Sequence, residues 1–409
     1  MTLFHLRPEQ QRQLFLVASG VSTAGSFAGI TAKGWILMDG SSQPFVLALN
    51  FAALSLPTLL ISGPAGVRTD RVGCERVLVQ SQWALLAAAA LGALAIPLLE
   101  GLAQVLLLLG STLLVGIAGA YELTARNKYC SILVDRHEQL GSYLTSFSVV
   151  FNVGKLVGPP IGGWLLAMTG PAWALGIDAA SYLLPIASVL FLLNPDRTRE
   201  QRSASGEKAS LLNAWRSCGS TLQGVLSLTA VLCLVSFFHP GLAPLIANRV
   251  LGPDPRDLGL FTSVLAAGSI SGGVVLQKNS DRFSQRPFLT LGGFGLITAI
   301  AQLGMAVTPG VGFSLAMAFL IGAGTAGLLS SCNLITQIGS EQVMRGRMAG
   351  LSQIAFLGGG GISGLMVAVL VMVKDLSTAF ALTGGASVAI ALVWMQRRGP
   401  RVLEPIRST

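Results

Sequence analysis

About twelve apolar stretches, each long enough to cross a lipid bilayer as a helix, follow one another along this chain of 409 residues. A spanning helix needs about 20 mostly apolar residues. Hydrophobic residues make up 52% of the chain and charged residues only 11%, and a soluble globule of this length could not hide so much apolar surface. The sequence therefore predicts an all-α membrane protein. The stretches cover residues 13–38, 45–66, 77–99, 102–124, 141–168, 172–193, 222–247, 257–278, 287–308, 311–338, 348–373 and 378–396.

A short motif occurs twice in the chain, at an offset of 211 residues. Asp70 with Arg71 and Asp281 with Arg282 each lie in a basic loop between two apolar stretches, and Arg136 matches Arg347 at the same offset. Repetition at half the chain length in so apolar a protein is typical of carriers built from two homologous bundles. We therefore expect one six-helix bundle over residues 1–195, a cytoplasmic linker over 196–220, and a second bundle with a short tail over 221–409.

The basic residues are distributed unevenly between the two ends of the predicted helices. With these spans, 22 of the 27 Lys and Arg residues fall on the side that also holds both termini. Because short loops rich in Lys and Arg stay in the cytoplasm, we predict a multi-pass protein of a bacterial-type inner or plasma membrane with both termini cytoplasmic. The net charge of +9 then reflects topology and anionic lipid headgroups, and a nucleic-acid partner is not expected.

Several motifs resemble those of one family of carriers. The loop G-V-R-T-D-R-V-G-C-E-R (66–76) resembles the signature that follows the second helix in the major facilitator superfamily. The segments 121–134, 151–163, 178–183 and 345–351 resemble the branch that contains enterobactin exporters and macrolide efflux proteins. The resemblance implies the major facilitator fold, with two pseudo-symmetric bundles and alternating access to a central site.

The loop after the second span is predicted to act as a conformational latch. Glycines permit a tight turn or close approach, and a carboxylate at a helix end can accept hydrogen bonds from the amides of another helix. By resemblance, Asp70 docks near the start of the eleventh span, and Arg71 or Arg76 pairs with Glu122. Alternatively, these arginines act only as topology signals. The residues assigned to the latch are Gly66, Asp70, Arg71, Gly73, Arg76, Glu122 and Arg126.

The fifth span carries small residues on one face and two prolines in its interior. Such a helix can bend and pack closely against a neighbour. The pattern resembles the motif of proton-driven antiporters of the drug-efflux type, and for that reason export is preferred to import. Close packing in a tight bundle is the alternative explanation. The motif consists of Gly154, Gly158, Pro159, Gly162 and Gly163.

Ionisable side chains within spans are costly in lipid and are therefore candidates for function. Asp178 is a candidate proton carrier, although it could instead lie near the outer surface or cap a kink with Ser181. Glu122 lies one turn from Arg126, so a fixed ion pair is the preferred role for it. His239, next to Pro240, either titrates near neutral pH or marks a helix break. Asn152 and Asn333 are candidate substrate contacts or interhelical hydrogen-bonding groups.

Two lysines within spans indicate an anionic substrate. Lys33 and Lys155, facing a central cavity, would attract a carboxylate-bearing solute such as a siderophore-like chelator. The alternatives are that Lys33 extends to the headgroups near Asp39 and that Lys155 pairs with Glu122. Aromatic residues in the spans could also line the cavity or pack against lipid and helices: Phe27, Trp35, Phe151, Trp164, Phe237 and Phe238.

The sequence as a whole predicts a secondary transporter and gives no sign of an enzyme. It contains no phosphate-binding loop, metal-ligand spacing or serine elbow, so we expect no cofactor and no metal site. The predicted function is export of a small amphipathic or anionic metabolite, siderophore-like or drug-like, by proton antiport in a carrier that works as a monomer. The alternatives are uptake or facilitated diffusion of an organic anion, and a non-transporting membrane sensor or assembly protein.

Overall fold

The computed structural model describes residues 8–41, 43–133, 137–192, 215–307, 310–340 and 345–399. Over these residues it is helical, and twelve segments are long and apolar enough to cross a membrane. The predicted fold class is therefore confirmed, and the segments follow the predicted stretches closely. The linker up to residue 214, Arg136 and the C-terminal tail lie outside the described residues.

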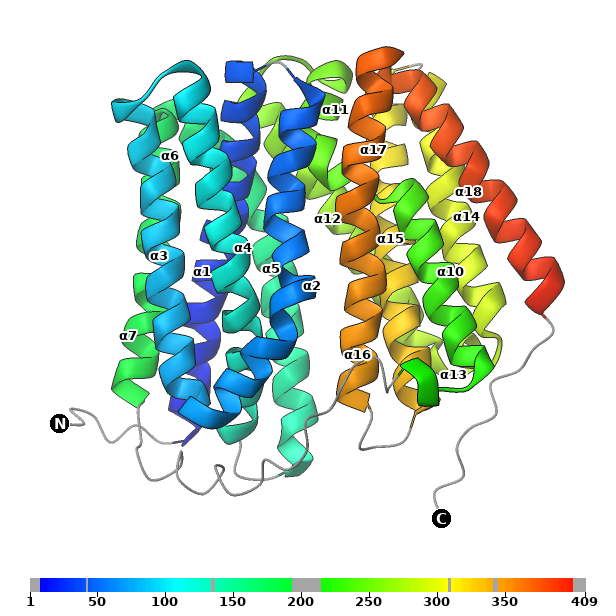
Figure 1. Cartoon of the computed structure of the whole chain (residues 1–409), viewed down its shortest axis with the longest axis horizontal. Coiled ribbons are helices and arrows are strands. Elements are labelled where there is room, and N and C mark those ends of the chain that lie inside the picture. The colour runs from blue at the N-terminus through cyan, green and yellow to red at the C-terminus, as the bar shows by residue number, and fades with distance from the viewer. Residues whose placement is uncertain are drawn as a thin grey trace. The chain divides into compact units, whose positions relative to one another are not determined.

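The first half of the chain forms seven described helices (Figure 1). They are α1 (Pro8–Ser41), α2 (Pro44–Val72), α3 (Cys74–Leu98), α4 (Gly101–Ile132), α5 (His137–Thr169), α6 (Pro171–Ser181) and α7 (Leu183–Leu192). The second half contains α10 (Ser220–Ser236), α11 (His239–Val250), α12 (Pro255–Lys278), α13 (Ser280–Gln285), α14 (Pro287–Val307), α15 (Val311–Ile338), α16 (Arg345–Gln353), a π-helical segment (Ile354–Gly358), α17 (Gly359–Val373) and α18 (Leu376–Arg398).

The chain divides into two compact units. The first contains residues 1–42, 53–207 and 254–263, and the second contains 43–52, 208–253 and 264–409. The start of α2 thus belongs to the second unit and the start of α12 to the first. The predicted division at residues 196–220 differs from these units in the two short segments and stays a prediction.

Helix ends follow the local sequence. Gly73 separates α2 from α3 with a φ of 102°, a left-handed conformation that glycine adopts without steric cost. The predicted tight turn at this residue is therefore present. At the start of α18, the side chain of Asp375 accepts a hydrogen bond from the backbone N–H of Thr378. This hydrogen bond lowers the pKa of Asp375, as expected for a carboxylate that caps a helix.

Two of the spanning segments are broken near prolines. Pro185 lies just after the junction of α6 and α7, and Pro240 lies just after the junction of α10 and α11. A proline cannot donate the hydrogen bond to the carbonyl four residues earlier. In the second break that carbonyl belongs to Ser236, and the side chain of Gln302 donates to it at 2.7 Å. A buried side chain thus satisfies a backbone group that lipid could not.

Glycines bring α12 and α15 into backbone contact within the second unit. A Cβ at Gly268 would clash with the carbonyl of Phe319, and one at Gly272 would clash with that of Ala323. By contrast, apart from the neighbouring backbone of its own helix, no described atom lies within 4 Å of the Cβ position of Gly273. Small residues of this kind are how membrane helices approach closely without a hydrophobic driving force.

We expect Gly272→Val to lower the stability of the protein by about 1–3 kcal/mol, because overpacking forces the two backbones apart. The neighbouring Gly273→Val is the matched control and should change stability little. Thermal unfolding of the two purified variants in one detergent gives the comparison. Equal melting temperatures for both would show that the α12–α15 contact does not require glycine.

Candidate functional site

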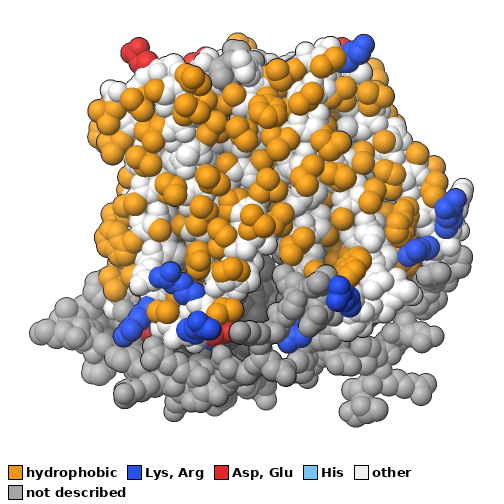
Figure 2. Space-filling model, viewed as in Figure 1, with side chains coloured by type: hydrophobic (Ala, Val, Ile, Leu, Met, Phe, Trp, Pro, Cys, Tyr) orange, Lys and Arg blue, Asp and Glu red, His pale blue; other side chains and the backbone are white. Residues whose placement is uncertain are grey.

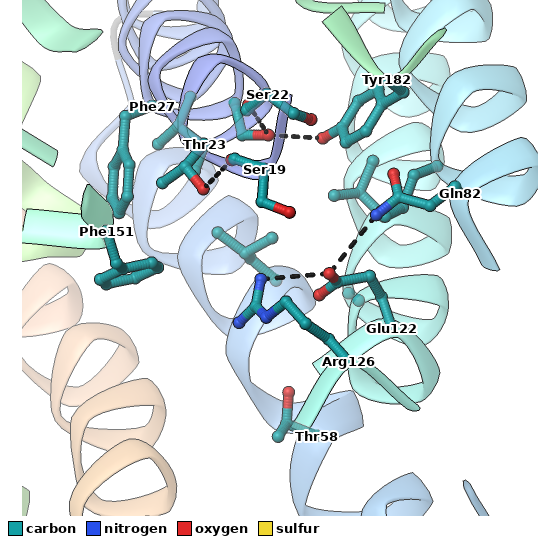
Figure 3. A pocket seen from close by; sticks show the side chains of 17 residues that line it. Ser19, Ser22, Thr23, Phe27, Thr58, Gln82, Glu122, Arg126, Phe151 and Tyr182 are labelled. Atoms are coloured by element: carbon teal, nitrogen blue, oxygen red, sulfur yellow. Dashed lines mark hydrogen bonds and ion pairs between the residues drawn. The ribbon is translucent and has the colours of Figure 1, made fainter. Parts of the chain in front are cut away.

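A cavity of about 260 Å³ lies within the first unit (Figure 3). Helices α1 to α5 and the residue that ends α6 contribute to its walls. Hydroxyl groups, two phenylalanines and one pair of charged side chains share the lining with small and aliphatic residues. The lining residues are Ser19, Ser22, Thr23, Ser26, Phe27, Ile30, Leu54, Thr58, Gln82, Leu85, Val115, Gly116, Gly119, Glu122, Arg126, Phe151 and Tyr182.

One face of α1 supplies most of the hydroxyl groups. Ser19, Ser22, Thr23 and Ser26 follow the i, i+3, i+4, i+7 pattern, which places them on one side of a helix. The hydroxyl of Thr23 donates to the Ser19 carbonyl at 2.7 Å, and that of Ser26 contacts the Tyr182 hydroxyl at 2.9 Å. Because each hydroxyl also has acceptor lone pairs, this wall can still accept hydrogen bonds from a bound molecule.

Glu122 and Arg126 form the charged part of the lining. Their ion pair spans 3.1 Å, one turn apart on α4, and the side-chain amide of Gln82 donates to the same carboxylate oxygen at 3.4 Å. Figure 3 shows the carboxylate of Glu122 between these two partners. The ion pair between Glu122 and Arg126 is thus present, and its predicted role as a fixed pair stays a prediction. Among the described residues, no salt bridge joins Glu122 to Arg71 or Arg76, and the pairing expected for the latch stays a prediction.

Two aromatic rings complete the cavity. Phe27 of α1 and Phe151 of α5 meet edge to face, with ring centroids 5.7 Å apart. Both were among the aromatic residues considered for a cavity wall, and both line it. Trp164, another of those residues, is largely exposed on the surface of α5. The rings give the cavity an apolar side opposite its charged pair, as drawn in Figure 3.

A second buried group of charges lies within the first unit but outside the cavity lining. Lys33 and Asp178 are 7% and 8% exposed, and they interact electrostatically between α1 and α6. The ammonium of Lys33 donates to the Ser111 hydroxyl at 2.9 Å. Gly29 makes room for the Asp178 carboxylate, since a Cβ there would clash with it. Lys33 therefore does not extend to the headgroups.

The carboxylate of Asp178 is incompletely satisfied in the described structure. Its Oδ1 is buried and has no hydrogen-bond partner there. The kink contact with Ser181 does form, but it joins the Ser181 hydroxyl to the backbone carbonyl of Asp178 at 2.7 Å. Tyr182 follows one turn after Asp178, lines the cavity, and has its hydroxyl 2.9 Å from that of Ser26. This tyrosine thus lies between the cavity and the buried charges.

Five of the seven predicted latch residues lie around the turn between α2 and α3, and the other two, Glu122 and Arg126, lie on α4. Asp70 forms an ion pair with Lys128 of α4, a partner that the sequence did not suggest. Arg71 and Arg76 are exposed. Apart from the neighbouring backbone of its own helix, no described atom lies within 4 Å of the Cβ position of Gly66, so the expected close approach of another helix at this glycine is not observed. The predicted contact of Asp70 with the eleventh span stays a prediction.

The glycine face of α5 packs against two helices of the first unit. Gly154, Gly158 and Gly162 contact the backbone or side chains of α1, and a Cβ at Gly163 would clash with the carbonyl of Pro255 at the start of α12. Gly259 of α12 likewise lies against α5, because a Cβ there would clash with the carbonyl of Pro159. The small residues of the motif therefore serve close packing, as the sequence predicted, and this packing forms one side of the cavity wall at Phe151.

The other candidate residues do not line this cavity. Asn152 and Lys155 are half-buried on α5. His239 begins α11, directly at the break, with its ring 5.0 Å from that of Phe237. Asn333 on α15 keeps its Oδ1 buried without a described hydrogen-bond partner. The described residues contain no group of three or more His, Cys, Asp or Glu side chains that could hold a metal ion.

Sequence reasoning missed the hydroxyl face of α1, Gln82, Tyr182 and Lys128. A signal for the first was available, because four Ser and Thr residues recur at helical spacing within one apolar span. Gln82 is a polar residue within the third span and could also have been noted. Nothing in the sequence indicated that Tyr182 would reach the cavity, since its direction depends on the break between α6 and α7.

The helical bundles and the polar cavity within the spans define a membrane transporter of the major facilitator superfamily, and not an enzyme. Over residues 3–402 the chain matches the family described as transmembrane secretion effectors, and it belongs to that family. The multidrug efflux pump Tap of Mycolicibacterium fortuitum is 24% identical over 364 residues, covering 85% of this chain and 86% of the pump. The multidrug efflux pump Tap of Mycobacterium tuberculosis H37Rv is also 24% identical, and the match covers 85% of this chain and 84% of the pump.

Solved structures share the fold. A mutant of the nucleoside transporter NupG superposes with a TM-score of 0.77 at 13% identity, covering 94% of this chain and 99% of NupG. A POT family transporter in complex with 5-aminolevulinic acid has a TM-score of 0.75 at 11% identity, covering 97% of each chain. These likenesses confirm the major facilitator fold that the sequence motifs implied.

Proposed function

We propose that this protein exports a small amphipathic organic molecule and that the cavity of the first unit contributes to binding it. The hydroxyl groups of α1 suit a substrate with hydrogen-bonding groups, and Phe27 and Phe151 suit an aromatic or aliphatic part. Membership of the secretion effector family and similarity to a multidrug efflux pump support export. The glycine motif of α5 is consistent with this direction.

The cavity favours a neutral or weakly charged substrate over an anion. The argument for an anionic, siderophore-like solute rested on Lys33 and Lys155, and neither lines the cavity. Lys33 interacts with Asp178, and Arg126, the cation that does line the cavity, is paired with Glu122. A drug-like amphipathic molecule is therefore the leading substrate class. Transport of an organic anion is the alternative that the efflux assay with carboxylate-bearing chelators tests.

For energy coupling, we assign the proton to Asp178. A carboxylate buried between membrane-spanning helices near one lysine can exist as an anion near a cation or, when protonated, as a neutral acid near a cation. Protonation of Asp178 alters the charge of this buried group by one and weakens the electrostatic attraction between Lys33 of α1 and Asp178 of α6. Because Tyr182 lies one turn after Asp178 and also lines the cavity, substrate binding and protonation have a physical route to influence each other.

The remaining expectations fit the same carrier. The excess of Lys and Arg on one side supports cytoplasmic termini. The turn at Gly73, with Asp70 and Arg71 beside it, remains the proposed latch for alternating access, and the ion pair between Asp70 and Lys128 holds the end of α2 against α4. Two bundles in one chain supply a complete transport unit, so we propose that the monomer is active.

The cavity assignment is tested by filling the space with one side chain. Gly119 lines the cavity and has open space at its Cβ position, so Gly119→Phe should occlude binding without a backbone clash. Gly110, on the same helix, also has open space but lies outside the lining, so Gly110→Phe is the matched control. The measurement is energy-dependent efflux of an amphipathic fluorescent dye from cells with equal amounts of each variant.

We expect Gly119→Phe to abolish most of the efflux and Gly110→Phe to retain it. Unchanged efflux in Gly119→Phe would show that the cavity does not bind substrate. If the dye is not transported by the unaltered protein, the same pair of variants is applied to carboxylate-bearing chelators, which tests the anion alternative.

A further inference from the structure

A groove separate from the cavity runs along the outer side of the first unit between α3 and α4. Its volume is about 530 Å³. Gln80, Ala84, Ala87 and Leu91 form one wall, and Leu114 and Ile117 belong to the other. The α3 positions are spaced by three or four residues, so they lie on one face of the helix. From Gln80 to Leu91 they extend over about 16 Å at 1.5 Å per residue.

The groove exists because the α3 residues that face it are mostly small. Ala84, Ala87 and Ala88 leave space that longer side chains would fill, while Leu114 and Ile117 of α4 stand beside them. Ala84, Ala87 and Leu114 are exposed, so the groove is open along its length. Both helices are membrane-spanning segments, and the groove follows their axes. Its length and apolar walls match a hydrocarbon chain that runs across one leaflet of a bilayer.

A cation is held at one end of the groove by all three neighbouring helices. Arg68 of α2 donates to the side-chain oxygen of Gln80 on α3 at 3.0 Å, and its guanidinium lies 5.9 Å from the ring centroid of Tyr121 on α4. Arg68 is exposed. Because the hydrogen bond to Gln80 uses one of five N–H donors, the guanidinium can still bind a phosphate at the mouth of the groove.

The surroundings of this end favour a negatively charged headgroup. Arg71 and Arg76, also exposed, lie in the same turn region between α2 and α3. Figure 2 shows apolar side chains over the face of α3 and α4 and basic side chains gathered toward its lower end. Basic residues near the membrane surface attract anionic lipid. A zwitterionic headgroup would bring its own cation into this positive region.

We propose that this groove binds one anionic glycerophospholipid, with its phosphate on Arg68 and one acyl chain along the α3–α4 groove. The bound lipid would join the end of α2 to α3 and α4, and so brace the turn that carries Gly73. This proposal does not depend on the proposed transport function, because it concerns the outer face of the first unit and none of the cavity residues.

The test measures lipid binding to the purified full chain in detergent, by native mass spectrometry and by the shift in melting temperature. Phosphatidylglycerol is compared with phosphatidylcholine of the same acyl chains. Arg68→Gln removes the cation, and Arg76→Gln is the control for general positive charge. Ala87→Phe fills the groove, and Leu94→Phe, at an exposed position of α3 outside the groove, is its control.

We expect the unaltered chain to retain one phosphatidylglycerol in preference to phosphatidylcholine. Arg68→Gln should weaken phosphatidylglycerol binding roughly fivefold, which corresponds to about 1 kcal/mol, and Ala87→Phe should weaken binding of both lipids. Leu94→Phe should bind like the unaltered chain. Arg76→Gln, which removes only a neighbouring positive charge, should weaken phosphatidylglycerol binding clearly less than Arg68→Gln does. The proposal is overturned if the two lipids bind equally, if Arg68→Gln and Arg76→Gln lose the same affinity, or if filling the groove has no effect.

Discussion

Asp178→Asn is expected to abolish export driven by a pH gradient while leaving exchange of substrate across the membrane intact. For one proton exchanged per neutral substrate, a gradient of one pH unit supplies about 1.4 kcal/mol and sustains about a tenfold accumulation. An amide cannot take up the proton, so the accumulation ratio of the variant should fall to about one. Reconstituted vesicles, assayed with and without the gradient, separate gradient-driven accumulation from counterflow of labelled substrate.

The same prediction distinguishes a proton carrier from a merely structural charge pair. Removing one partner leaves Lys33 as a buried uncompensated charge, which destabilises a protein, whereas removing both partners is often tolerated. The double variant Lys33→Gln with Asp178→Asn should therefore regain the stability of the fold and still fail to accumulate substrate. Asp39→Asn, at an exposed carboxylate of the same helix as Lys33, is the control. Gradient-driven accumulation in the double variant would assign Asp178 a structural role only.

Arg126→Gln is expected to destabilise the protein by about 3 kcal/mol, because it leaves the buried carboxylate of Glu122 without its cation. This value is near the lower end of the cost of breaking a buried ion pair, since water in the cavity can solvate the unpaired carboxylate. Both side chains of the pair are largely buried, with exposures of 15% for Arg126 and 12% for Glu122. Gln82 alone then remains as a partner for the carboxylate. Thermal or denaturant unfolding in detergent micelles measures the loss.

The double variant Glu122→Gln with Arg126→Gln should recover most of that stability, since two neutral amides can share the cavity with Gln82. Arg76→Gln, at an exposed arginine, should have little effect and controls for the loss of positive charge. If Arg126→Gln is as stable as the unaltered protein, the pair is solvated and contributes little. If the double variant is no more stable than the single one, Arg126 acts through contacts other than Glu122, such as its position over the Phe147 ring.

The sequence was sufficient for the fold because the membrane imposes a simple rule. Each span needs about 20 apolar residues with internally satisfied backbone groups, and such stretches can be counted directly. Gly73 was also predictable, because a turn between two spans requires a conformation that glycine adopts freely. The close packing of α5 followed from the spacing of Gly154, Gly158 and Gly162. In each case a local pattern determined the structural result.

The candidate site was less predictable because it depends on which way side chains face. Lys33 could have extended to the headgroups, and only the packing of α1 against α6 places it near Asp178. The hydroxyls of α1 were overlooked because Ser and Thr within a helix commonly bond to a carbonyl one turn earlier, as Thr23 does here. Tyr182 reaches the cavity through the break before α7. Such directions follow from tertiary packing and not from spacing along the chain.

Simultaneous recording of proton and substrate flux in vesicles that contain only this protein tests proton antiport most directly. An imposed gradient of an amphipathic substrate, with no initial pH difference, should drive protons in the opposite direction, and the proton signal should vanish in Asp178→Asn. Substrate movement with no accompanying proton movement in the unaltered protein would contradict the account. Protons that move in the same direction as the substrate would contradict it as well, and would indicate uptake by symport.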